Sequence, residues 1–165
     1  MHQSSKMQEI ERKYLVVGEY KHLAHSSIRM TQGYIASGRR TVRVRISDNR
    51  AWLTIKGPSR DGGLSRFEWE REIEPREALE LMTLAEGALI DKRRHLIEYE
   101  GHTFEVDEFY GDNEGLVIAE VELSSEDEHV SLPDWIGREV TGIKRYYNSH
   151  LREHPYSSWS DNERI

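Results

Sequence analysis

Apolar and charged residues alternate with a period of two in many short segments of this 165-residue chain. The segment TVRVRIS at 41–47 is representative, because Arg43 and Arg45 alternate with three aliphatic residues. Side chains two residues apart point to the same face of a strand. The pattern therefore predicts strands that have one apolar face and one charged face.

The same alternation recurs along most of the chain. It is found in EIERKYLV (9–16), AWLTIKG (51–57), SRFEWEREI (65–73), TFEVDEF (103–109) and IAEVEL (118–123). Residues typical of turns separate these segments at 47–50, 57–63, 100–102 and 111–115. This order predicts consecutive antiparallel hairpins.

Three helices are expected between the strands. One begins at Pro75 and ends before Gly87, with apolar residues at helical spacing. A short one begins with a capping box of Ser125 and Glu128 and ends near Pro133. A third is expected over 143–150.

We expect one domain. It spans residues 7–151, with tails at 1–6 and 152–165, and the final dozen residues resemble a loose tail.

The composition excludes several functional classes. Thirty acidic against 23 basic residues give a net charge of −7, which disfavours a nucleic-acid backbone binder. Cysteine is absent, so disulfides and thiolate metal sites are excluded. No stretch approaches the ~20 apolar residues that span a bilayer, and no signal peptide is recognisable. We expect a soluble cytoplasmic protein that binds neither nucleic acid nor membrane.

The charged faces of the strands carry nearly balanced numbers of acids and bases. The acids are Glu9, Glu11, Glu68, Glu70, Glu105, Asp107, Glu120 and Glu122, and the bases are Lys13, Arg43, Arg45, Lys56, Arg66, Lys92 and Arg94.

For any one strand, such a face is most simply a solvated surface with weak cross-strand ion pairs. Its recurrence in six or seven strands favours a mainly β (α+β) fold, in which an antiparallel barrel encloses the charges and helices flank its apolar exterior.

Such a charged lumen suits a complex of metal and polyphosphate. Clustered carboxylates without Cys or His ligands suit Mg²⁺ or Mn²⁺. Clustered Arg and Lys suit phosphate oxygens. Two divalent cations balance a triphosphate of about −4 to −5.

The ordered motifs resemble those of the CYTH superfamily, the triphosphate tunnel metalloenzymes. The first is Glu9-x-Glu11-x-Lys13. The others are TQGYI (31–35), VRVR (42–45), LTIKG (53–57), GGLSRFEWE (62–70), DKRR (91–94), FEVDEF (104–109), AEVEL (119–123) and EVTGIKRYYN (139–148). The resemblance implies an eight-stranded antiparallel tunnel that binds triphosphates with a divalent metal and cleaves a phosphoanhydride bond.

The resemblance also implies roles for individual residues. It implies phosphate binding by Lys13, Arg43, Arg45, Lys56, Arg66, Lys92 and Arg94. It implies metal binding by Glu9, Glu11, Glu120 and Glu122, with Asp107. It makes Glu68, Glu70 and Lys92 candidate catalytic residues, with Glu68 and Glu70 placing either a second metal or the attacking water. Further candidates are Tyr34, Glu105, Lys144 and Arg145; Ile143 stands where relatives often carry an acid, which weakens the last two.

Several functions fit this resemblance. The chain is most similar to small bacterial enzymes that hydrolyse inorganic tripolyphosphate to diphosphate and phosphate. An adenylyl cyclase of class IV, a thiamine triphosphatase and a non-catalytic polyphosphate-binding module are the alternatives. A homodimer is expected from the family alone.

Overall fold

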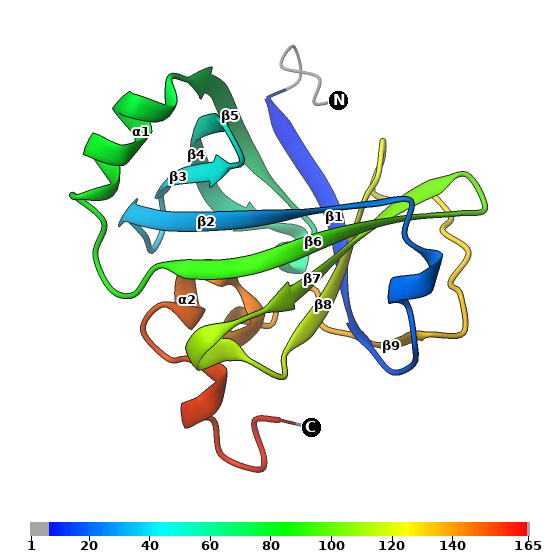
Figure 1. The fold of residues 1–165 in the computed structure, drawn as a ribbon. Coiled ribbons are helices and arrows are strands. Elements are labelled where there is room, and N and C mark those ends of the chain that lie inside the picture. Colours follow the sequence, from blue (N-terminus) through cyan, green and yellow to red (C-terminus); the bar gives the residue numbers. More distant parts are fainter. Residues whose placement is uncertain (1–6, 165) are drawn as a thin grey trace.

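The computed structural model describes residues 7–164 as a barrel of antiparallel strands with short helical segments around it (Figure 1). The strands are β1 (Gln8–Val16), β2 (Ser26–Ala36), β3 (Thr41–Ser47), β4 (Arg50–Arg60), β5 (Ser65–Ile73), β6 (Ile90–Tyr99), β7 (His102–Phe109), β8 (Val117–Glu122) and β9 (Ile136–Glu139).

Eight of these strands close into a ring. Neighbouring strands pair in the order β5-β4-β3-β2-β6-β7-β8-β1, and β1 then pairs with β5. In that closing pair Gln8 lies opposite Phe67 and Ile10 lies opposite Ser65. The expected eight-stranded antiparallel barrel is therefore confirmed.

The ninth strand was not predicted. The edge of β1 that pairs with β5 up to Ile10 pairs farther along with β9. There Tyr14 lies opposite Glu139, and Val16 lies opposite Ile136. β1 therefore extends past the rim of the ring that β5 forms.

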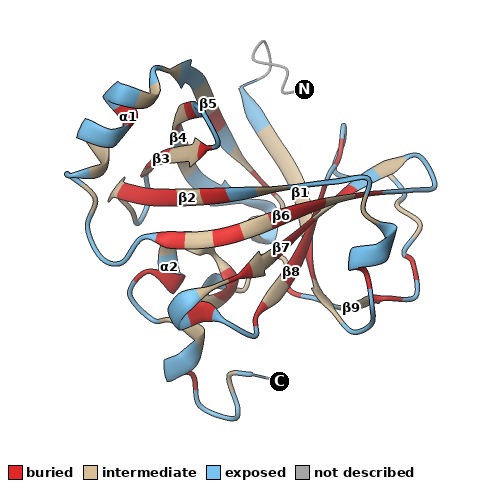
Figure 2. Cartoon of the chain, in the orientation of Figure 1, coloured by how far each residue is buried: buried red, intermediate tan, exposed pale blue. Residues whose placement is uncertain are grey.

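Apolar side chains on the outer wall are covered by two groups of segments, which leaves the charged faces inside. Helix α1 (Pro75–Met82) lies over β2, β3 and β4 and buries Ala78 against Val44 and Ala51 (Figures 1 and 2). A Cβ on Gly33 of β2 would overlap Met82 and Ala85, so glycine allows this close approach.

The second cover lies over β6, β7 and β8. Trp135, in the segment that leads into β9, packs edge-on against Phe104 with ring centroids 5.7 Å apart. Tyr20, beside the 3-10 helix η1 (Lys21–Leu23), joins the same cluster. Alternation of charge does not by itself determine which face of the sheet lines the barrel interior. Because these two groups of segments cover the apolar face, that face lies on the outside of the barrel.

One end of the barrel is filled by an apolar cluster. Tyr34, Ile90 and Phe109 project inward from their strands and meet Tyr146 and Trp159 from the C-terminal part of the chain. This part contains η4 (Lys144–Tyr146), α2 (Asn148–Leu151) and η5 (Tyr156–Ser158). Because these side chains fill the barrel there, we call this the closed end.

Two expectations for the C-terminal part are wrong. The helix expected over 143–150 is broken at Tyr147, which is extended (φ −76°, ψ 137°). The loose tail is also wrong for 154–159, since Trp159 is only 5% exposed and its indole donates to the His154 carbonyl at 3.0 Å.

The helix expected between Ser125 and Pro133 is absent, and that segment consists of turns and irregular backbone. Glu128 bonds instead to the Ser124 backbone N–H at 2.6 Å and lies 2.6 Å from the His102 ring. Among residues 7–164, no helix has both the length and the apolar character needed to cross a bilayer.

Candidate active site

A cavity of about 650 Å³ occupies the barrel interior, and its wall carries the charges predicted from the sequence. The predicted site residues that line it are Glu9, Glu11, Lys13, Tyr34, Arg43, Arg45, Lys56, Arg66, Glu68, Glu70, Lys92, Arg94, Glu105, Glu120 and Glu122. Three predicted residues do not line it: Asp107, Lys144 and Arg145.

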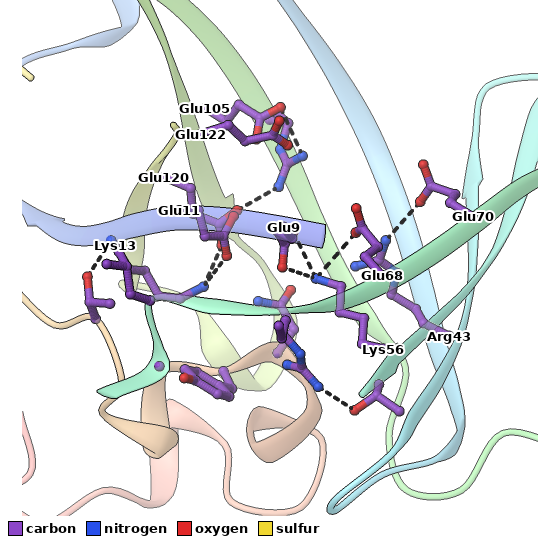
Figure 3. A pocket seen from close by; sticks show the side chains of 18 of the residues that line it. Glu9, Glu11, Lys13, Arg43, Lys56, Glu68, Glu70, Glu105, Glu120 and Glu122 are labelled. Carbon is purple, nitrogen blue, oxygen red and sulfur yellow. Dashed lines mark hydrogen bonds and ion pairs between the residues drawn. The ribbon is translucent and has the colours of Figure 1, made fainter. Parts of the chain in front are cut away.

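Carboxylates from β1 and β8 meet on one side of the cavity. Glu11 lies opposite Glu122 in the strand register, and Lys13 lies opposite Glu120. The Glu11 side chain lies beside Glu120, and the Glu122 side chain lies beside Glu105 (Figure 3). Burial and the neighbouring carboxylates of Glu120 and Glu9 raise the pKa of Glu11 well above its usual value. Burial together with Glu105 and Glu9 raises the pKa of Glu122 to about 7. This side of the cavity therefore has more negative charge than its own lysines balance.

Two lysines hold the acids that do stay ionised. Lys56 Nζ lies 2.9 Å from Glu9, and Lys13 Nζ lies 2.6 Å from Glu120 (Figure 3). Against the effect of burial, these contacts keep the pKa of both glutamates low. Lys13 also lies 3.6 Å from Glu11, which fits a lysine that ties the acid cluster together.

The opposite imbalance occurs toward the closed end. Burial, with Arg94 and Arg45 beside it, lowers the pKa of Lys92 to about 7 despite the attraction of Asp107. Burial, with Arg43 and Arg94, lowers the pKa of Arg45 to about 10. These cations are destabilised by burial and by neighbouring arginines, so an anion bound here would stabilise them.

Two further arginines of the cavity wall are incompletely paired. The buried Nε of Arg43 has no hydrogen-bond partner among the described residues. Arg66 donates to the Gly57 carbonyl and the Thr41 hydroxyl, and no carboxylate of residues 7–164 lies within ion-pair distance of it. Unpaired donors in a buried wall are costly unless a ligand meets them.

Asp107 is placed differently from the other predicted metal ligands. It is 1% exposed, and Arg94 binds both of its oxygens at 2.8 and 2.9 Å. Lys92 Nζ approaches the same carboxylate at 2.8 Å. Asp107 therefore lies behind the cavity wall, where it anchors two cations and has no oxygen free toward the cavity.

Two glutamates of β5 lie on the wall between the acidic and basic sides. Glu70 accepts hydrogen bonds from Thr54 at 2.6 Å and Arg43 at 3.4 Å. Burial and Glu9 raise the pKa of Glu68, with Lys56 3.7 Å away. A carboxylate with a raised pKa is suited to accept a proton near neutral pH.

Lys144 and Arg145 lie away from the cavity. Lys144 is exposed, whereas Arg145 stacks over the Tyr146 and Trp159 rings and donates to the Glu163 carbonyl at 2.9 Å. Arg145 therefore holds the C-terminal segment to the closed end.

The acidic side fits a divalent cation. No three His, Asp or Glu side chains within 7–164 are gathered as a preformed metal cluster. Glu11 and Glu122 nevertheless both have raised pKa values, Glu11 through burial with Glu120 and Glu9 and Glu122 through burial with Glu105 and Glu9. A hard cation with oxygen ligands would relieve this repulsion among the carboxylates.

Sequence reasoning missed two uncharged residues, one that lines the cavity and one that lies behind its wall. Asn148 lines the cavity, and its Oδ1 accepts from Lys92 Nζ at 2.8 Å. Gln32, which is fully buried, accepts from Arg45 Nε at 2.7 Å. The position of Gln32 on the inward face of β2 was the available signal.

Comparisons with known proteins agree with this geometry. Residues 7–149 match the family model described as the CYTH domain. An inorganic triphosphatase of Acetivibrio thermocellus is 48% identical over 93% of this chain and 98% of that protein. An inorganic triphosphatase of Nitrosomonas europaea is 35% identical over 88% of this chain and 97% of that protein.

The fold comparison gives the same relationship. The crystal structure of the inorganic triphosphatase NE1496 superposes with a TM-score of 0.62 and 32% identity, over 87% of this chain and 93% of that one. The charged lumen and the matches over nearly the whole chain lead to one conclusion: this protein belongs to the CYTH domain family.

Proposed function

We propose that this protein is a divalent-metal-dependent inorganic triphosphatase, which hydrolyses tripolyphosphate to diphosphate and phosphate. The observation that carries the proposal is the separation of charge in one cavity. Destabilised cations lie toward the closed end, and destabilised carboxylates lie along β1 and β8. A complex of a polyphosphate and a divalent cation neutralises both.

The basic residues bind the phosphate oxygens. Arg45 and Lys92 hold the phosphates toward the closed end, and Arg43 contributes its guanidinium charge from β3. Lys56, Arg66 and Arg94 complete the wall. Donors fixed before the reaction stabilise charge that develops on the leaving diphosphate. Asp107 keeps Lys92 and Arg94 in place and is an anchor in this proposal.

The acids bind the cation and orient the water. Glu9, Glu11, Glu120 and Glu122 would hold Mg²⁺ or Mn²⁺. When bound, the cation neutralises phosphate oxygens and polarises water. Glu68 accepts the proton of the attacking water as a phosphorus–oxygen anhydride bond breaks, and Glu70 holds Arg43 beside it.

An assay of three substrates in parallel tests this proposal. Tripolyphosphate, ATP and thiamine triphosphate are each supplied with Mg²⁺, Mn²⁺ or EDTA, and phosphate and cyclic AMP are both measured. We expect rapid release of phosphate from tripolyphosphate with metal and none with EDTA. Exclusive formation of cyclic AMP from ATP would reverse the proposal.

Glu11→Ala tests the cation site. We expect it to abolish metal-dependent phosphate release, because it removes one of the carboxylates that would hold the cation. The fold should persist, because the lost carboxylate repels Glu120 and Glu9. Melting temperature and circular dichroism report the fold. Glu114→Ala, at an exposed position outside the cavity, is the control and retains full activity. Unchanged turnover in Glu11→Ala would rule out the cation assignment.

The homodimer and the cytoplasmic location belong to the proposal as well. Sedimentation velocity over a hundredfold range of concentration measures the first, and cell fractionation measures the second.

A further inference from the structure

A chain of hydrogen bonds joins neutral side chains to the cations at the closed end. Lys92 Nζ donates to Asn148 Oδ1 at 2.8 Å, and Arg45 Nε donates to Gln32 Oε1 at 2.7 Å. Gln32 Nε2 links the two by lying 3.3 Å from Asn148 Oδ1, and it also donates to the Tyr34 hydroxyl at 3.2 Å. We call Gln32, Tyr34 and Asn148 the amide floor.

The chemistry of the donors fixes the orientation of both amides. A lysine ammonium and an arginine guanidinium only donate hydrogen bonds. The amide oxygen of Asn148, and not its nitrogen, must therefore face Lys92. Likewise, the amide oxygen of Gln32 must face Arg45. Each amide is locked in one direction, although amide oxygen and nitrogen have almost the same shape.

This orientation leaves two donors without an acceptor. Asn148 Nδ2 has no hydrogen-bond acceptor among the described residues, and the Tyr34 hydroxyl accepts from Gln32 without donating to any of them. Both side chains line the cavity. Among the described residues, Asn148 Nδ2 is not one of the side-chain atoms that are both fully buried and without a hydrogen-bond partner. Because it has no partner, it must be accessible, and it is therefore open to the cavity.

The Asn148 side chain does not cap the N-terminus of its helix. Asn148 is the first residue of α2, and the preceding Tyr147 makes no side-chain capping bond. The Asn148 side chain is directed at Lys92 and not at the backbone of the helix. Gln32 is fully buried and exchanges hydrogen bonds only with side chains of the cavity wall.

We propose that the amide floor binds the terminal phosphate of the substrate. In this site Asn148 N–H and Tyr34 O–H donate to phosphate oxygens. Gln32 acts as a positioning residue for them and for Arg45, while Asn148 also positions Lys92. The inference rests on the proposed function, because it names the subsite for one phosphate of the triphosphate.

Three variants separate these roles. Asn148→Asp keeps an oxygen for Lys92 but replaces the N–H donor with a negative charge. Asn148→Ala removes both interactions. Gln32→Glu keeps the acceptor for Arg45 but removes the donor to Tyr34. Each is examined by calorimetric binding of tripolyphosphate in EDTA, by KM and kcat with Mg²⁺, and by melting temperature.

We expect the Kd for tripolyphosphate to rise about 10-fold or more in both Asn148 variants, because a hydrogen bond to a charged group is lost. KM should rise in parallel, with kcat changed less than about threefold, since the terminal phosphate is held equally before and during the reaction. Gln32→Glu should show the same pattern.

Asn113→Ala is the matched control, because Asn113 is a buried asparagine outside the cavity whose Oδ1 accepts from the Tyr156 backbone at 2.9 Å. We expect a lower melting temperature and an unchanged Kd.

Two results would overturn the inference. One is a Kd within twofold of the original in both Asn148 variants, whatever their melting temperature. The other is a large fall in kcat at unchanged Kd, which would place Asn148 at the reacting phosphate. Binding in EDTA needs no turnover, so the inference can be judged even if the original protein binds tripolyphosphate without hydrolysing it.

Discussion

Glu122 lies on the acidic side of the cavity, and its protonation controls how well a cation can bind. Burial with Glu105 and Glu9 raises its pKa from 4.5 to about 7. It is protonated at pH 6 and ionised at pH 8, and a metal binds the ionised form. The Mg²⁺ concentration that gives half-maximal activity should therefore fall as the pH rises from 6 to 8.

Glu122→Gln provides the comparison, because glutamine has the same shape and no titration. We expect weaker activation by Mg²⁺ at pH 8 and a flatter pH dependence. Identical pH profiles for the two proteins would contradict the assignment.

The same raised pKa predicts that, without metal, Glu122 lowers stability as the pH rises from about 4.5 to about 7, because the folded state binds the proton more tightly than the unfolded chain.

At the scale of elements, the C-terminal segment is part of the barrel's closed end. Trp159 packs edge-on against Tyr146 with ring centroids 5.2 Å apart and lies in the cluster that contains Phe109. We expect Trp159→Ala to lower the free energy of unfolding by about 3–5 kcal/mol. Denaturant titration measures the loss.

Trp69→Ala is the control for that variant. Trp69 is half-buried on the outer wall of β5, with Arg71 over its ring. Its loss should be clearly smaller than that of Trp159→Ala. Equal losses would show that the closed end does not depend on the C-terminal segment.

Alternation of charge predicted the strands and which side chains share a face, because inward and outward positions differ by one residue. It did not predict which of the inward-facing side chains reach the cavity and which are covered by others. Asp107 has the same parity as Glu105, yet it lies behind the wall while Glu105 lines the cavity.

Segments whose structure depends on distant contacts were also missed. Glu128 looked like part of a capping box, but His102 and Ser124 bind its carboxylate from outside any helix. β9 is four residues long, and it forms because β1 offers an unpaired edge beyond Ile10. Gln32 and Asn148 carry no charge, so charge alternation did not select them, and only the inward position of Gln32 on β2 marked either one.

At the scale of the whole molecule, metal and polyphosphate should stabilise the fold together. The cavity wall is internally paired through contacts such as Lys56–Glu9 and Lys13–Glu120. Either ligand alone relieves one side of the cavity but leaves it with a net charge, whereas both together relieve both sides and keep the cavity near neutral. Differential scanning fluorimetry should show a larger rise in melting temperature with Mg²⁺ and tripolyphosphate than the sum of the separate rises. Additive rises would argue against one shared site.

The most direct test of the charge separation is a crystal structure with Mn²⁺ and tripolyphosphate, in which anomalous scattering locates the cation. We predict an Mn²⁺ peak coordinated by carboxylates of β1 and β8, including Glu11 and Glu122, with the phosphate chain extending from it toward Lys92. A peak outside the cavity, or a phosphate chain bound on the outer wall, would contradict the account.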